Sequence, residues 1–194
     1  MVWKLFDSYE IREMSQEDFR PHFQPLVKKI FGDSMQSFQV QDTITRRDEP
    51  KVAKLKANMG TPHVLRLGVF HKTKFVGWHT GLQTDGGSAF YMQNSAIVKK
   101  HRRKGLYSAL LERTIEIVDN MGYQAIYSRH HMTNNAVLIP KLKKGFKITS
   151  FELSDRYGSM VQLTRYKSKT RNKVLDYRVG MIKPDKELLS YFAK

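Results

Sequence analysis

Hydrophobic and polar residues alternate in short runs along the chain, and the spacing of the apolar positions separates strands from helices. A period of two is typical of a strand with one buried face, whereas steps of three and four are typical of a helix. The sequence predicts a strand over 9–14, helices over 15–31 and 49–59, and strands over 63–70, 74–84 and 89–98. The last three are separated by short turn-forming segments, 71–73 and 85–87, so they predict an antiparallel meander.

The period changes at Leu106, where apolar residues begin to recur at steps of three and four and predict a helix that Gly122 ends. The elements expected after it are a strand over 123–128, a helix over 135–144, and strands over 146–153 and 159–166. This alternation of strand and helix behind a meander predicts a mixed sheet with helices on its faces. The stops expected for the two N-terminal helices are Gly32 and Gly60.

The last part of the sequence differs in composition from the rest. Residues 167–173 are Lys, Arg, Ser, Thr and Asn, which is typical of a solvated connector. An edge strand is expected over 174–179 and a short helix over 185–192, after Pro184. We therefore expect one domain over residues 1–166 and a basic C-terminal extension over 167–194 that packs on or near it.

Charge and composition narrow the classes of function. Lys and Arg number 34 against 18 acidic residues in a chain of 194, which gives a formal charge of +16 and a field that attracts anions. Nucleic acid is an allowed partner but is not expected from charge alone, because basic surfaces are commonly just solvated. The absence of cysteine excludes disulfides and thiolate chemistry. No apolar run suits a signal peptide or a membrane span, so we expect a soluble, cytoplasmic protein without a membrane partner.

The candidate chemistry begins where the strand over 89–98 runs into the turn Lys99 to Gly105 and then into a helix. Five of those seven residues are Lys or Arg. Free backbone N–H groups and the positive end of a helix dipole meet at such a turn and stabilise an anion. Gly105 has no Cβ to keep a phosphate away from the backbone. Taken alone, a basic turn with one glycine is more often a solvated loop.

Two motifs in register change that interpretation. The stretch from Arg102 to Leu111, RRKGLYSALL, resembles the acyl-CoA-binding motif of the GNAT superfamily of N-acetyltransferases: Arg or Gln, two residues, Gly, one residue, then Gly or Ala. Arg102 and Gly105 match, whereas Tyr107 stands at the position of the usual small residue. The family's second pattern is met further along by Asn134, Val137, Gly145 and Phe146.

The resemblance covers residues 9–166 and implies an α/β (α+β) fold. That fold is a mixed, twisted and splayed sheet of about seven strands with helices on both faces, and the pantetheine of the cofactor lies in the gap. The implied cofactor-binding residues are Ala96, Ile97, Val98, Arg102, Arg103, Lys104, Gly105, Leu106, Tyr107, Ser108, Asn134 and Asn135. Backbone N–H groups of residues 103–108 would hold the pyrophosphate and Asn134 the pantetheine. Either asparagine could instead cap a helix.

The catalytic residues are less clearly marked. At the position of the family's usual tyrosine acid stands Lys141, preceded by Pro140, and the central strand carries Tyr91 and no carboxylate. His130 is favoured as a group for proton transfer, because its ordinary pKa is near neutral; the alternative is a histidine in a basic surface loop. The candidate catalytic residues are therefore His130, Lys141 and Tyr91, and no metal is expected.

The implied activity is transfer of an acetyl group from acetyl-CoA to an unidentified primary amine, on a small molecule or a protein, by direct attack in a ternary complex. The alternative is a catalytically weakened module that binds CoA or nucleic acid, and homodimerisation is left open. Trp78 and His79 either face the acceptor pocket or belong to the core. Residues 35–47 occupy the region that usually shapes acceptor specificity in the family.

Overall fold

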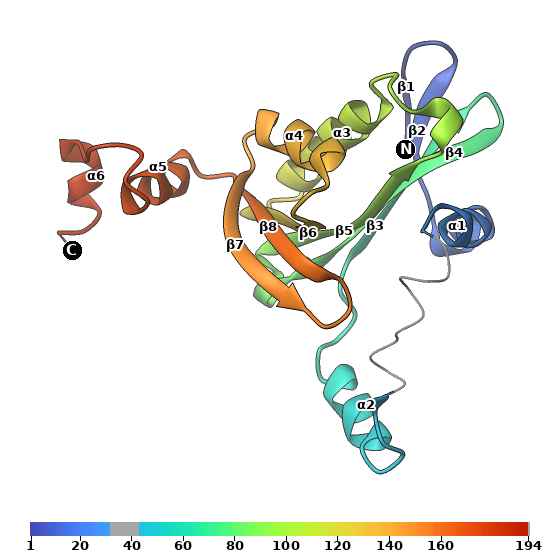
Figure 1. Ribbon diagram of the computed structural model, residues 1–194, viewed down its shortest axis with the longest axis horizontal. Helices are drawn as coiled ribbons and strands as arrows, with labels where there is room; N and C mark the ends of the chain where they lie inside the picture. The colour runs from blue at the N-terminus through green and yellow to red at the C-terminus, as the bar shows by residue number, and fades with distance from the viewer. Residues whose placement is uncertain (32–42, 194) are drawn as a thin grey trace.

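The computed structural model describes residues 1–31 and 43–193, which form one eight-stranded sheet with helices around it (Figure 1). In chain order the strands are β1 (Val2–Lys4), β2 (Tyr9–Glu13), β3 (Val64–His71), β4 (Lys74–Thr84), β5 (Ala89–Ile97), β6 (Ala125–His131), β7 (Lys147–Ser154) and β8 (Gly158–Tyr166). The helices are α1 (Gln16–Phe31), α2 (Glu49–Ala57), α3 (Leu106–Asn120), α4 (Asn135–Lys143), α5 (Lys169–Arg178) and α6 (Lys186–Ser190), with short 3-10 turns η2 (Asp85–Gly87) and η3 (Lys99–His101).

The sheet order is β1-β2-β3-β4-β5-β6-β8-β7, and only the central pair β5 and β6 is parallel. That pair is short, because only residues 89–91 of β5 lie opposite residues 125–127 of β6. Beyond Tyr91 the two strands are not paired with each other, so the sheet opens at its centre. The predicted mixed sheet with a splayed centre is confirmed.

Two clusters of buried side chains fix the helices on opposite faces. On one face, Leu106 and Leu110 of α3 and Leu138 of α4 pack with Phe90 of β5 in the larger cluster. On the other face, Phe19 of α1 packs with Trp78 and Ala96, one from β4 and one from β5. The helices therefore cover both faces of the sheet, as Figure 1 shows.

The C-terminal segment differs from its prediction. Residues 169–178 form helix α5, so the connector predicted over 167–173 and the edge strand predicted over 174–179 are wrong. The helix begins there because the Ser168 hydroxyl accepts a hydrogen bond from the backbone N–H of Arg171. A predicted stop, Gly32, lies outside the described residues, and so does most of segment 35–47.

Two strands also differ from their predictions. β1 is an additional three-residue strand that pairs with β2, with Val2 opposite Arg12. β6 continues through His130 and His131, which were expected to follow the strand, because both residues pair with β8. The extension matters for the site, since it fixes both histidines on the sheet.

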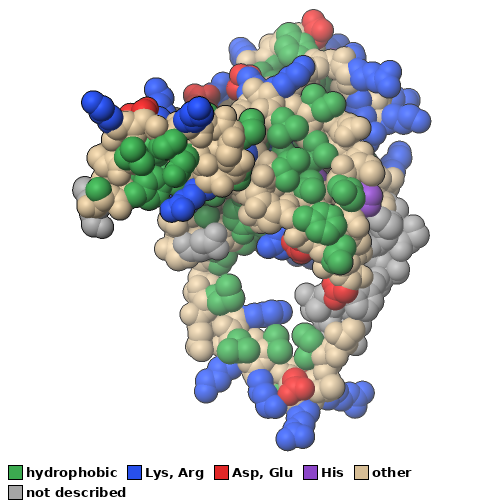
Figure 2. All heavy atoms as spheres, turned by 60° about the vertical axis from the view of Figure 1, so that its left-hand side comes forward, with side chains coloured by type: hydrophobic (Ala, Val, Ile, Leu, Met, Phe, Trp, Pro, Cys, Tyr) green, Lys and Arg blue, Asp and Glu red, His purple; other side chains and the backbone are tan. Residues whose placement is uncertain are grey.

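Helices α5 and α6 stand away from the sheet as an arm (Figure 1). An ion pair between Lys147 of β7 and Asp176 of α5 joins the arm to the sheet, and Arg171 lies 4.1 Å from the centre of the Tyr166 ring. Tyr191 and Phe192 are exposed, and Figure 2 shows hydrophobic side chains gathered on this part of the surface. Within the described residues, no helix is both long enough and apolar enough to cross a membrane.

Candidate functional site

The turn between β5 and α3 has an unusual backbone. Arg103 (φ 60°) and Gly105 (φ 77°) both adopt the left-handed conformation. A Cβ built on Gly105 would meet only the Phe6 ring, at 3.9 Å, so the positive φ and not crowding within the protein requires glycine here. The first helical hydrogen bond runs from the N–H of Ala109 to the carbonyl of Gly105, which leaves the preceding N–H groups of α3 without helical partners. The turn thus presents free donors at the positive end of a helix.

Two side chains anchor this turn to the sheet. The Arg102 Nε donates a hydrogen bond of 2.8 Å to the carbonyl of Ile97, the last residue of β5. The Tyr9 hydroxyl of β2 lies 2.8 Å from the Nδ1 of His101. Desolvation, followed by the charges of His71 and of nearby lysines, lowers the pKa of His101. The turn is therefore held in place before any ligand arrives.

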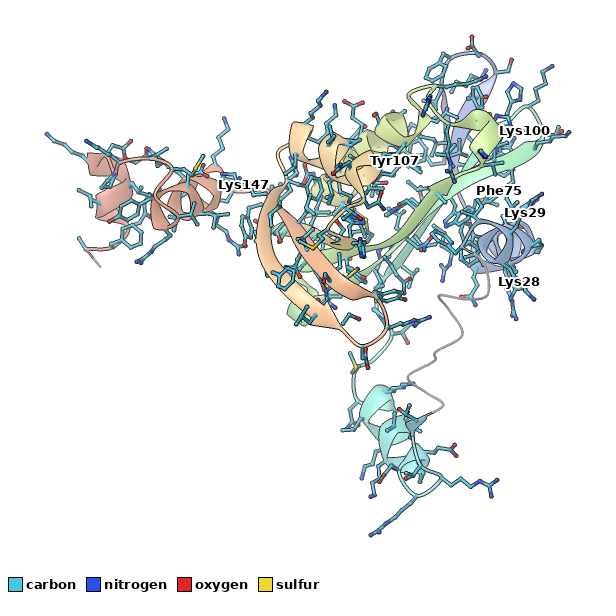
Figure 3. All side chains as sticks on the ribbon, viewed as in Figure 1. Lys28, Lys29, Phe75, Lys100, Tyr107 and Lys147 are labelled. Carbon is cyan, nitrogen blue, oxygen red and sulfur yellow. The ribbon has the colours of Figure 1, made fainter. Side chains whose placement is uncertain are left out.

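A cavity of about 560 Å³ lies beside the turn, in the open centre of the sheet. The predicted cofactor-binding residues that line it are Ala96, Ile97, Arg102, Arg103, Gly105, Leu106, Tyr107, Ser108 and Asn134. Val98, Lys104 and Asn135 belong to the same segments but do not line it. Tyr107 is labelled in Figure 3; it lies in the first turn of α3 and packs against the larger buried cluster. The free helix donors suit an anionic group, and the cavity beside them has room for an extended ligand.

The Asn134 side chain is available to bind a ligand and does not cap the helix that follows it. It is the N-cap residue of α4, yet its side chain makes no capping hydrogen bond. The residue is exposed and lines the cavity. Since an asparagine at this position ordinarily accepts a bond from the helix backbone, its uncommitted amide is available to a molecule in the cavity.

Lys141 and His130 come together in the interior, on the face that α3 and α4 cover. Lys141 is 1% exposed, and its Nζ lies 3.1 Å from the Sδ of Met92 and 4.8 Å from the centre of the Phe146 ring. Among the described residues no carboxylate pairs with Lys141, and burial lowers its pKa to about 7. The His130 Nε2 lies 2.9 Å from the Ser128 hydroxyl, and burial, followed by the charge of Lys141, lowers its pKa to about 3.

His79 is a second histidine of this interior, and it belongs to the core and not to an exposed pocket. It is fully buried, and its Nδ1 lies 2.8 Å from the hydroxyl of Ser95, a residue that lines the cavity. Burial, followed by the charge of Lys141, lowers its pKa to about 3. Trp78 is also buried, on the opposite face, where its Nε1 donates to the Asn94 side chain. The sequence did not identify Ser95 as a candidate, because its contact with His79 joins two different strands.

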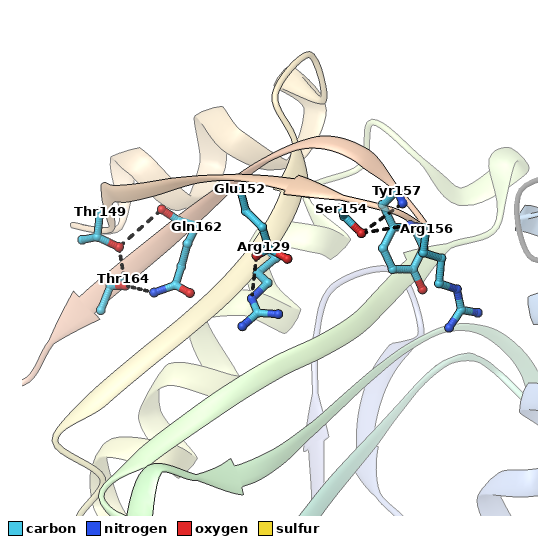
Figure 4. A network of polar contacts seen from close by, with 8 residues as sticks. All are labelled: Arg129, Thr149, Glu152, Ser154, Arg156, Tyr157, Gln162 and Thr164. Atoms are coloured by element: carbon cyan, nitrogen blue, oxygen red, sulfur yellow. Dashed lines mark hydrogen bonds and ion pairs between the residues drawn. The ribbon is translucent and has the colours of Figure 1, made fainter. Parts of the chain in front are cut away.

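Tyr91 lies on the opposite face of the sheet from Lys141. Its ring stacks on that of Tyr127 at 5.0 Å between centres, and Arg129 lies over it at 5.8 Å. Arg129 is held by Glu152, with 3.3 Å between Nε and the carboxylate (Figure 4). Burial raises the pKa of the Tyr91 hydroxyl. The structure therefore brings two of the three predicted catalytic residues together and separates the third from them.

The described part of the chain holds no cluster of three or more His, Cys, Asp or Glu residues able to bind a metal ion. The site consists of a cavity with free backbone donors at one end and a group of buried basic side chains beside it. Such a site can hold an extended anionic ligand and can move protons without a metal ligand set.

A family model described as "Acetyltransferase (GNAT) family" matches residues 11–146 of the chain. This span contains the turn, α3, α4 and the buried basic group. No curated protein is significantly similar to the chain in sequence.

Solved structures share the fold at low sequence identity. The ribosomal-protein-S5-alanine acetyltransferase of Vibrio fischeri aligns with a TM-score of 0.62 and 10% identity over 87% of this chain and 98% of its own. The ribosomal-protein-S18-alanine N-acetyltransferase of Escherichia coli aligns at 0.57 with 16% identity over 82% and 94%. A GNAT family acetyltransferase of Elizabethkingia anophelis with acetyl-CoA bound aligns at 0.53 with 14% identity over 82% and 99%.

Proposed function

The chain belongs to the GNAT acetyltransferase family, and on that premise we propose that it transfers an acetyl group from acetyl-CoA to a primary amine by direct attack. The observation that carries the proposal is the cavity beside the turn. Nine of the twelve residues that the family resemblance assigns to the cofactor line this single cavity. Acetyl-CoA would enter as a substrate and supply the thioester.

The turn and the cavity would bind different parts of acetyl-CoA. The free N–H groups at the start of α3 would donate hydrogen bonds to the pyrophosphate, and the basic side chains of the turn add an attractive field. The uncommitted side chain of Asn134 would bond the pantetheine arm. Because the turn is already anchored through Arg102 and His101, little ordering is needed on binding.

The chemistry requires that the attacking amine be neutral and that the departing thiolate receive a proton. With a pKa of about 7, Lys141 populates both protonation states near neutral pH and is the better candidate for proton transfer. The sequence favours His130, but with a pKa of about 3 a neutral His130 is a weak base, so we assign it a supporting role beside Lys141. Tyr91, on the opposite face with Arg129 and Glu152, is proposed to face the acceptor.

We propose that the acceptor is a protein amine. Two of the structures with this fold are named for acetylation of ribosomal-protein alanines, which supports an acceptor of that class. The formal charge of +16 would favour encounter with an acidic partner or with a protein associated with RNA.

Release of free CoA thiol from acetyl-CoA, measured with peptides of varied N-terminal residue and with small amines, tests the activity. We expect amine-dependent thiol release and an acetylated amine of matching mass. CoA affinity is measured alongside by calorimetry. Measurable CoA binding together with no thiol release for any amine would contradict acetyl transfer and favour a binding role.

A further inference from the structure

The interior of the site contains polar groups that neither folding nor cofactor binding explains. His79 is fully buried, and its Nε2 has no hydrogen-bond partner among the described residues. Lys141 is buried with a methionine sulfur as its hydrogen-bond partner. Burying such groups without full partners costs stability, so their presence suggests a function.

A bulge in β5 brings these groups onto one face of the sheet. Thr80 lies opposite Asn94 and the next residue, Gly81, lies opposite Met92, so Gln93 is an extra residue in β5. Side chains alternate along a regular strand, and Met92 and Ser95 would then point to opposite faces. With the extra residue, Met92 reaches Lys141 while Ser95 reaches His79. Re-aiming a side chain beside an active site is a known role of bulges.

The resulting order of groups runs from the cavity into the core. Ser95 lines the cavity, and its hydroxyl lies 2.8 Å from the Nδ1 of His79. Gly81, which lies opposite Met92, is two residues along β4 from His79, so Met92 and His79 point to the same side of the sheet. The Lys141 amine, which contacts the Met92 sulfur, lies on that side as well. Imidazole can accept a proton at one nitrogen while it donates from the other.

We propose that Ser95 and His79 form a proton path that connects Lys141 to the cofactor cavity and delivers a proton to the departing CoA thiol. This inference rests on the proposed acetyl transfer. Ser95 is the residue that would touch the reacting sulfur, and His79 is a positioning residue that acts through it. In the resting state His79 carries its proton on Nδ1, so the Ser95 hydroxyl hydrogen is free to point into the cavity.

The carbon–nitrogen bond to the amine forms, the carbon–sulfur bond breaks, and the sulfur takes the electron pair. The sulfur then receives the Ser95 proton, and Ser95 takes the Nδ1 proton of His79. The Lys141 ammonium turns from the Met92 sulfur towards the ring and gives a proton to the unpartnered Nε2 of His79. Lys141 is left neutral and His79 carries its proton on Nε2. After CoA leaves, the proton that the attacking amine lost to solvent returns along the same path, to Ser95, from Ser95 to Nδ1 of His79 and from Nε2 to Lys141, which restores the resting state. No proton is stored on His79, so its low pKa is no obstacle.

Three variants test the path. Ser95→Ala is expected to lower kcat for thiol release about 100-fold with little change in the KM for acetyl-CoA, the lower end of what proton donors contribute. Ser95→Thr, which keeps the hydroxyl, should retain most of the activity. Thr114→Val is the control, because it removes a buried hydroxyl that is bonded to the Leu110 carbonyl within α3 and lies outside the path, and it should leave kcat unchanged.

A nitrogen-15 spectrum of the His79 ring provides a readout that is independent of activity. The Nδ1–H tautomer is expected from pH 5 to 9, in the free and the CoA-bound protein. An Nε2–H tautomer in both states, or a Ser95→Ala variant as active as Thr114→Val, would overturn the path. A wild-type protein that releases no thiol would contradict the proposed function itself. An active wild type with unaffected variants would contradict only the proton path.

Discussion

The turn before α3 and the interior beneath α4 are adjacent parts of one site, but different physical means build them. The turn is exposed and works through its backbone: left-handed residues, free N–H groups, and two side chains that tie it to the sheet. The interior presents side chains: the buried Lys141 and His79 and the half-buried His130, with no carboxylate paired to Lys141 among the described residues. The proposed pyrophosphate site is thus built mainly by one short segment, whereas the proposed proton transfer depends on residues from several segments.

The strongest test of this contrast is Lys141→Met, which keeps the apolar stem and removes the amine. We expect kcat for thiol release to fall by about 10² to 10⁴-fold, the range for loss of a general acid or base, while CoA affinity stays near the wild-type value. The folded pKa of about 7 lies below the usual lysine value, so the charged form is destabilised in the fold. The variant should therefore have a larger free energy of unfolding than the wild type at pH 6, measured by urea denaturation. Equal loss of affinity and kcat would contradict the division between turn and interior.

The same difference between the turn and the interior explains which parts of the protein could be predicted from its sequence. The periodicity of residues 63–98 and 106–121 predicted the meander and α3, because these elements bury one regular face. The turn was found because Arg102 and Gly105 stand at fixed spacing within one short segment. Ser95 could not be found in this way, since its pairing with His79 depends on the register of two strands and on one bulged residue. α5 was missed because a serine cap outweighed a weak strand pattern.

The pH dependence of stability tests the description of the interior, because His79 and His130 should both contribute to it. His79 and His130 have pKa values lowered to about 3 in the fold, against an ordinary value near 6.5. Between these values the unfolded chain binds more protons, so the free energy of unfolding falls as pH drops from 6.5 towards 3. The expected slope is about 1.4 kcal/mol per pH unit for each histidine.

Urea denaturation at steps from pH 7 to 4.5 measures this slope above the range in which most carboxylates titrate. His79→Gln should reduce it by about half if the variant folds, and the ring resonances of His130 give a second measurement in the wild type. A histidine that becomes protonated in the folded protein near pH 6 would show that the interior is more open than the structure indicates.

A smaller effect is expected at the turn. Gly105→Ala places a Cβ on a residue with φ of 77°, a conformation that costs an ordinary residue about 1–2 kcal/mol. If the free turn relaxes and CoA must restore it, affinity for CoA falls by about 5 to 30-fold, which calorimetry measures. Gly122→Ala is the matched control, with φ of 95° at the other end of α3. It should lower the free energy of unfolding and leave CoA affinity unchanged; an equal loss of affinity would mean that α3 as a whole, and not its first turn, governs binding.

The smallest effects are expected at two N-cap residues, one proposed to bind the ligand and the other a helix cap. Asn134 makes no capping bond at the start of α4, whereas Ser168 accepts one from the N–H of Arg171 at the start of α5. Asn134→Ala should weaken CoA binding by about 1 kcal/mol, the value of one hydrogen bond, with no change in Tm. Ser168→Ala should lower stability by about 0.5–2 kcal/mol and leave CoA affinity unchanged. Calorimetry with CoA and thermal denaturation of both variants check this pair. A lower Tm for Asn134→Ala with unaltered affinity would return Asn134 to a structural role and leave the turn as the main determinant of CoA binding.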